Sequence, residues 1–203
     1  MIKIYILDEV WEYSNHVNEI VPLFSKLNDL TNKADLVIQQ IIIDDTEITG
    51  DFMDYLSENI DSIDEIHIQV IDKREMLDEM LVTSSQYLTR ALPEMTLFIN
   101  QLYQGLNDLV WNKFSVFIEG LQYVIYTLDS ISQSVNRYTT FPNSALFLQE
   151  LNLVLQQLME ASINKDNALM ADILNYELKP HLEKLQGLFT HTIDSEVKRN
   201  DLQ

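Results

Sequence analysis

The hydrophobic period of this chain changes near Asp72, and that change constrains its fold more than any other sequence feature. Before Asp72, apolar residues alternate with others over residues 2–6 and 66–70, and short apolar runs rich in Ile and Val occupy residues 36–43. After Asp72, apolar residues recur every three or four positions almost to the C-terminus. Alternation is typical of strands, and the longer spacing is typical of helices. We therefore predict an α+β protein with a small domain over residues 1–72 and a helical domain over residues 73–203.

Other signals complete the predicted small domain. A second strand is expected over residues 10–13, and the apolar spacing of residues 21–33 predicts a helix with Pro22 in its first turn. A short helix is expected after Gly50. The predicted order is therefore strand, strand, helix, strand, short strand, short helix, strand.

The stretch QIIIDDTEITGDFMDYLSENIDSIDEIHIQV, residues 40–70, carries a resemblance to a known fold. It has an apolar strand, a two-residue turn at Asp44 and Asp45, a short strand, a short helix and a closing strand. In spacing and apolar placement it resembles the second half of ubiquitin, which implies a β-grasp fold for this domain. No Gly-Gly follows the last strand, so the resemblance does not imply conjugation. An α+β sandwich with another strand order remains the alternative.

The helical domain is predicted to be a four-helix bundle. Breaks in the apolar spacing place helices at about residues 73–103, 108–138, 144–163 and 166–197. Pro93 is expected to kink or split the first of these segments, and Pro180 is expected to bend the last one. Short connections between the helices favour antiparallel neighbours.

The net charge narrows the choice of partner. The chain has 13 Lys and Arg against 32 Asp and Glu, a formal net charge of −19. Residues 1–72 hold 3 Lys, no Arg and 16 carboxylates, so most of the acidity belongs to the small domain. Such a chain repels nucleic acids and anionic membranes. We expect a protein partner with a basic or apolar surface, no nucleic-acid binding and no membrane insertion.

The absence of cysteine excludes disulfides, thiolate catalysis and cysteine-ligated metals. The N-terminus lacks the apolar core of a signal peptide, so we expect a cytoplasmic protein. No glycine-rich phosphate loop or nucleophile motif occurs. Glu177 and His181 share a helix face, but a single pair does not hold a catalytic metal. We therefore predict no cofactor, no metal and no catalytic residue.

Two groups of residues are candidates for binding a partner. The first is acidic and lies around the predicted turn and short helix: Asp44, Asp45, Glu47, Asp51 and Asp54. Read as a calcium loop that starts at Asp45, it has Leu56 where the closing Glu is required, so a solvated turn and a helix N-terminus explain it better. The second is aromatic and lies on the second helix of the bundle: Trp111, Phe114 and Phe117. That helix is either buried at the centre of the bundle or keeps one side for a partner helix.

These features together favour a non-catalytic cytoplasmic protein-interaction module, an adaptor or a chaperone-like binder of another protein. We expect the acidic group to steer a basic partner and the apolar contacts to retain it. Two alternatives stay open. One is an enzyme with a dispersed site, and the other is an acidic mimic of nucleic acid that inhibits a DNA-binding protein.

Overall fold

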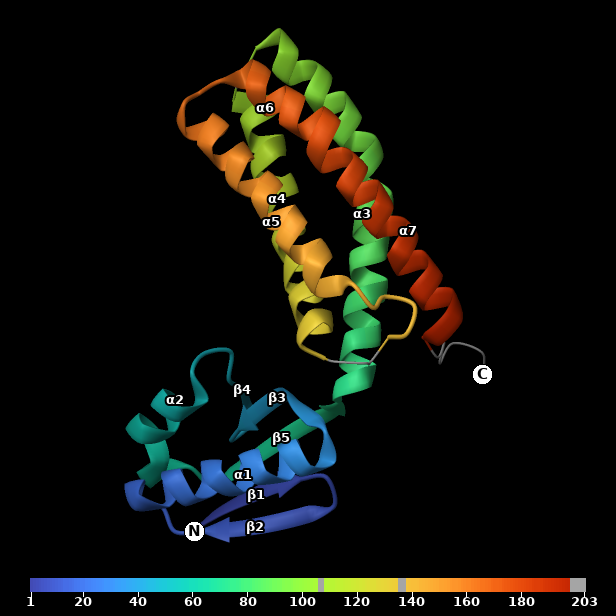
Figure 1. Cartoon of the computed structure of the whole chain (residues 1–203). Coiled ribbons are helices and arrows are strands. Elements are labelled where there is room, and N and C mark those ends of the chain that lie inside the picture. The colour runs from blue at the N-terminus through green and yellow to red at the C-terminus, as the bar shows by residue number, and fades with distance from the viewer. Residues whose placement is uncertain (106–107, 135–137, 198–203) are drawn as a thin grey trace. The chain divides into compact units, whose positions relative to one another are not determined.

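The computed structural model describes residues 1–105, 108–134 and 138–197. The chain divides into two compact units, Met1–Met76 and Leu77–Gln203. The first unit contains a five-stranded sheet with two α-helices, and the second is helical in its described part (Figure 1). The protein therefore belongs to the α+β class, as the change of hydrophobic period predicts.

The sheet of the first unit is mixed. Its strands are β1 (Ile2–Ile6), β2 (Glu9–Tyr13), β3 (Leu36–Ile43), β4 (Thr46–Glu47) and β5 (Glu65–Asp72). They lie in the order β2-β1-β5-β3-β4. β1 runs parallel to β5, and the other three pairings are antiparallel. The strands expected from the sequence are all present, whereas the β-grasp name remains a prediction.

Two helices supply the remaining core of this unit. α1 (Ile20–Ala34) presents Leu23 and Leu27, and α2 (Phe52–Asn59) presents Leu56, all nearly inaccessible to solvent. They join the isoleucines of the strands in one apolar cluster. Short 3-10 turns, η1 (Val17–Glu19) and η2 (Ile60–Ser62), precede α1 and follow α2. Both helices therefore belong to the same face of the sheet, the one that forms the core.

The turn between β3 and β4 has two residues, as the sequence predicts. Ile43 pairs with Thr46, and the φ angles of Asp44 and Asp45 are 44° and 65°. Asp is among the few residues other than Gly that adopt this left-handed conformation readily. Positive φ at both central positions matches the right-handed twist of the two strands.

The second unit corrects the prediction of four helices. Its described residues form six helical elements: α3 (Lys73–Gln104), α4 (Asp108–Gln133), α5 (Ser144–Ile163), α6 (Asn167–Ile173), η3 (Leu174–Leu178) and α7 (Lys179–Glu196). The last three follow one another without a break, so the predicted fourth helix is divided by the π-helical turn η3. This turn immediately precedes Lys179-Pro180, where the ring nitrogen of Pro180 has no hydrogen for a carbonyl four residues earlier.

Two other boundaries differ from the expectation. α3 continues through Pro93 without splitting, and the buried side chains of Leu92 and Met95 anchor it on both sides. α4 ends at Gln133, before the expected end near residue 138. Residues 135–137, at the end of that predicted helix, lie outside the described part of the chain.

Close contacts join α3 to α4. The ring of Tyr87 lies over Gly120, and a Cβ atom at that glycine would be 2.2 Å from Cε2 of the tyrosine. The Tyr87 hydroxyl donates a hydrogen bond of 2.8 Å to the carbonyl of Phe117. Burial raises the pKa of Tyr87 to about 12. A second contact is the buried hydrogen bond of 2.8 Å between the hydroxyls of Ser84 and Thr127.

One carboxylate ties the segment before α5 to the end of α7. Glu196 accepts hydrogen bonds of 2.6–3.1 Å from the backbone N–H and the hydroxyl groups of Thr139 and Thr140. Burial raises the pKa of Glu196, but these hydrogen bonds outweigh burial and lower it from 4.5 to about 2. The ionised carboxylate therefore contributes to the folded state of this unit.

In the part of the chain that the structure describes, no helix has the length and apolar character needed to cross a membrane.

Candidate interaction surface

The face of the sheet opposite α1 and α2 carries the most distinctive surface of the first unit. Alternation sends Ile4, Ile66 and Ile43 into the core and their neighbours to the other face. Register then aligns one outward residue from each strand: Val10 with Tyr5, Tyr5 with His67, His67 with Ile42, and Ile42 with Glu47. We call these five residues the open-face row.

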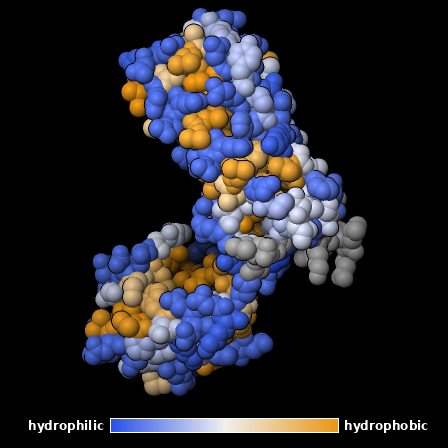
Figure 2. Space-filling view, in the orientation of Figure 1, coloured by the Kyte–Doolittle hydropathy of each residue, from blue (hydrophilic) through white to orange (hydrophobic). Residues whose placement is uncertain are grey.

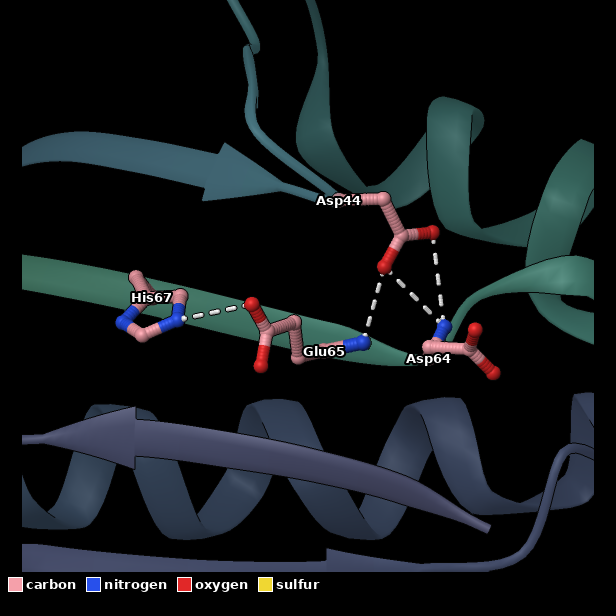
Figure 3. A network of polar contacts seen from close by, with 4 residues as sticks. All are labelled: Asp44, Asp64, Glu65 and His67. Carbon is pink, nitrogen blue, oxygen red and sulfur yellow. Dashed lines mark hydrogen bonds and ion pairs between the residues drawn. The ribbon is translucent and has the colours of Figure 1, made fainter.

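The open-face row combines apolar and aromatic side chains that solvent still reaches. Val10 is 55% exposed, and Tyr5 and Ile42 are half-buried. The Tyr5 and His67 rings stack, with centroids 4.5 Å apart and planes 9° apart. His67 Nε2 lies 3.4 Å from Oε1 of Glu65, and both side chains are 43% exposed (Figure 3). The open-face row is therefore a solvent-accessible contact area that crosses the sheet, with two stacked rings near its centre.

Carboxylates lie along one side of the open-face row and at its β4 end. In the adjacent register line, Lys3 pairs with Glu12 on one side and with Glu65 on the other. Glu47, on β4, is the last residue of the row, and Asp45 lies in the turn between β3 and β4. The apolar centre of this face thus has an acidic margin.

Asp44 fixes the start of β5 against the β3–β4 turn. Its carboxylate accepts hydrogen bonds from the backbone N–H of Glu65, at 2.9 Å, and of Asp64, at 3.1 and 3.3 Å (Figure 3). The Asp44 N–H donates in turn to the carbonyl of Glu65. These bonds determine where β5 begins, and therefore where Glu65 and His67 lie.

The five acidic candidates from the sequence have different roles. Asp51 caps α2, because its carboxylate accepts hydrogen bonds from the N–H groups of Met53 and Asp54. Asp44 and Asp51 therefore serve the backbone, while Asp45, Glu47 and Asp54 are exposed. Glu47 belongs to the open-face row, whereas Asp54 lies in the first turn of α2, which packs on the core side. The structure does not gather the five on one face.

The aromatic candidates belong to the second unit and also divide. Phe114 is 7% exposed and stacks on Phe98 with ring centroids 5.7 Å apart, so it is a core residue. Trp111 is 44% exposed, and the centroids of its ring and the Phe114 ring are 5.6 Å apart. Phe117 is half-buried. Trp111 is thus the member of this group that reaches the surface most.

Other apolar side chains of the second unit also reach the surface, and on α4 Leu109, Val116 and Tyr123 recur every seven residues and so lie on one side of the helix. Figure 2 shows small apolar groups among hydrophilic side chains on the side of the helices that it presents. Isolated apolar residues of this kind are normal on protein surfaces.

Glu177 and His181 are in contact through the backbone carbonyl of the glutamate. His181 Nδ1 lies 2.8 Å from the backbone carbonyl of Glu177, and its ring packs edge-on against Phe147. Among the described residues, no group of three or more His, Asp or Glu side chains is placed to hold a metal ion. His181 therefore contacts both the preceding turn η3 and a ring on α5.

Sequence reasoning missed the open-face row as a unit. Alternation with Ile66 and Ile68 indicates that His67 points away from the core, and the structure confirms this. The signal for Tyr5 is the same alternation with Ile4 and Ile6. The neighbours of these residues across the sheet depend on strand order and register, which the pattern does not specify.

The fold and this surface define a class: an α+β chain with an acidic sheet unit and a helical unit. The family model described as "Domain of unknown function (DUF8042)" matches residues 79–188. That match covers more than half of the chain, so the chain belongs to this family. It falls within the helical unit and leaves the sheet outside. No curated protein and no solved structure matches the chain.

Proposed function

We propose that this protein is a non-catalytic cytoplasmic interaction module, an adaptor or a chaperone-like binder, that binds a partner protein through the open-face row. The observation that carries the proposal is the row itself. Three of its members, Val10, Tyr5 and Ile42, are apolar or aromatic side chains in solvent contact on the face opposite the packed helices. Aromatic side chains such as Tyr5 are enriched among the residues that dominate affinity at protein interfaces.

The rigidity of the site supports the same function. The row lies on paired strands, and Asp44 holds the start of β5 through backbone hydrogen bonds. A surface that is ordered before binding loses little conformational entropy when a partner docks. A binding site on a sheet is therefore better suited to specific recognition than one on a loop.

The arrangement of the sheet unit supports its assignment as a β-grasp fold. The sheet unit has a helix between its second and third strands, and its strands lie in the order β2-β1-β5-β3-β4. We propose the β-grasp assignment on this ground. The cytoplasmic location is proposed on the absence of cysteine in the sequence.

A retention experiment with matched surface variants tests the proposed function. The full chain, Ile42→Asp and Val21→Asp are immobilised and exposed to lysate of the native organism. Val21 is 67% exposed on α1, so its substitution adds the same charge away from the open face. We expect a protein retained by the wild type and by Val21→Asp but not by Ile42→Asp. Equal retention by all three folded chains would contradict the proposal.

A further inference from the structure

We infer that the segment of the partner that occupies the open-face row is extended and basic, with apolar side chains seated on Tyr5, His67 and Ile42. This inference rests on the proposed function of the same surface. It goes further in naming the chemistry of what binds, and it depends on the charges around the row and on the shape of the face.

The outward positions of the described strands carry a net negative charge. Among the outward positions of the described strands, Lys3 is the only Lys or Arg, and its register partners are Glu12 and Glu65. These two carboxylates exceed that single positive charge. Glu47 and Asp45 add further negative charge at the β4 end. A partner with Lys or Arg side chains therefore complements this face, and an acidic partner is repelled.

Another cation of the sheet unit, Lys26, lies on the core side of the sheet. Lys26 on α1 lies with Nζ 3.9 Å from the centroid of the Trp11 ring. Trp11 is buried, and it donates a hydrogen bond of 2.6 Å from Nε1 to the Glu9 carboxylate. Lys26 therefore covers the core side of β2 and does not neutralise the open face.

The shape of the face suits an extended segment. Strands lie about 4.8 Å apart, so a row that crosses five strands is roughly 19 Å long. An extended chain rises about 3.3 Å per residue, so roughly six residues of a partner cover this length. Alternate side chains of an extended segment point to the same side, so apolar residues at every second position all face the row. The positive charge of the basic residues between them attracts the segment to the acidic margin.

The two kinds of contact have different consequences. Exposed ion pairs contribute only about 0–1 kcal/mol each and are screened by salt, so the carboxylates mainly steer and orient the segment. Apolar contact with the row supplies most of the affinity that remains at high salt. Tight binding therefore requires basic and apolar side chains in the same peptide.

Three heptapeptides test this inference on the full-length chain. One alternates Lys and Leu, the second alternates Lys and Ser, and the third alternates Glu and Leu. Amide chemical shifts of the ¹⁵N-labelled protein are followed during each titration. We expect the Lys-Leu peptide to shift the amides of Tyr5, Ile42 and His67 and to bind at least tenfold tighter than the other two. Ile42→Ser should weaken this binding tenfold or more, while Val21→Ser, on α1, should leave it unchanged.

The outcomes separate the inference from the function on which it rests. If the Glu-Leu peptide binds the row as tightly as the Lys-Leu peptide, the basic partner is wrong and the interaction surface stands. If the Lys-Ser peptide binds as tightly as the Lys-Leu peptide, apolar contact with the row adds nothing and the inference fails. It also fails if the amide shifts spread to Asp29 on α1 and Glu58 on α2, because the peptide is then attracted by the charge of the whole chain. If no peptide shifts the row and the retention experiment also shows no dependence on Ile42, both proposals fail.

Discussion

At the scale of single residues, Asp44 shows how an exposed carboxylate can belong to the structure rather than to the binding surface. We predict that Asp44→Ala lowers the free energy of unfolding by about 1–2 kcal/mol more than Asp45→Ala does. Both residues have positive φ, so alanine strains the backbone at both positions, and the difference isolates the lost acceptor of the Asp64 and Glu65 N–H groups. Urea unfolding followed by Trp11 fluorescence, in a Trp111→Phe background, measures it. Equal losses would show that the Asp44 bonds add nothing.

Two glycines in helices provide a second comparison. We predict that Gly120→Ala is destabilising by about 1–3 kcal/mol, because the new methyl group overlaps the Tyr87 ring and displaces its hydrogen bond to Phe117. Gly187→Ala in α7 has open space around its Cβ and should stabilise the chain by about 0.5–1 kcal/mol through higher helix propensity. Thermal unfolding of the two variants provides the measurement. A stable Gly120→Ala variant would mean that Tyr87 moves aside without cost.

At the scale of elements, the segment before α5 depends on one ionised side chain at the end of α7. The folded-state pKa of Glu196 lies below its ordinary value, so its contribution is present above pH 4.5 and is lost as the pH falls toward 2. We predict that Glu196→Gln is less stable than the wild type at pH 7 and that this difference shrinks between pH 4.5 and pH 2. Urea unfolding across this pH range measures it. Glu119→Gln, on the exposed side of α4, is the control, and a pH-independent difference for Glu196→Gln would contradict the prediction.

The elements were predictable to different degrees. The three longest strand signals and α5 lie where the periodicity places them, because burial on one face imposes that period on the sequence. The division of the last helix by η3 was not predictable. Pro180 indicates that the helix is disturbed at this point. Whether the helix responds with an extra residue in one turn or with a kink depends on how Leu174 and Leu178 pack in the core.

At the scale of the whole molecule, the charge of −19 should govern how quickly a basic partner arrives. We predict that Asp45→Asn with Glu47→Gln slows association of the Lys-Leu peptide and flattens its dependence on salt. Asp29→Asn with Glu58→Gln removes the same charge from the exposed sides of α1 and α2 and should have a smaller effect. Stopped-flow association between about 50 and 300 mM salt, over which the Debye length falls from roughly 14 to 6 Å, compares them. Equal salt slopes for the two double variants would show that the position of the charge on the surface is unimportant.

The sequence by itself determined the α+β class, the position where strands give way to helices, and the sign of the charge. These properties are local or additive, since periodicity reports burial and composition reports charge. Only the tertiary structure decided which acidic and aromatic residues are available to a partner. The Asp44 carboxylate accepts hydrogen bonds from N–H groups 20 and 21 residues further along the chain. The Phe114 ring stacks on an aromatic ring of another helix. Tyr5 and His67 meet only because β1 and β5 pair in parallel, and such pairing between distant segments depends on the packing of the whole unit.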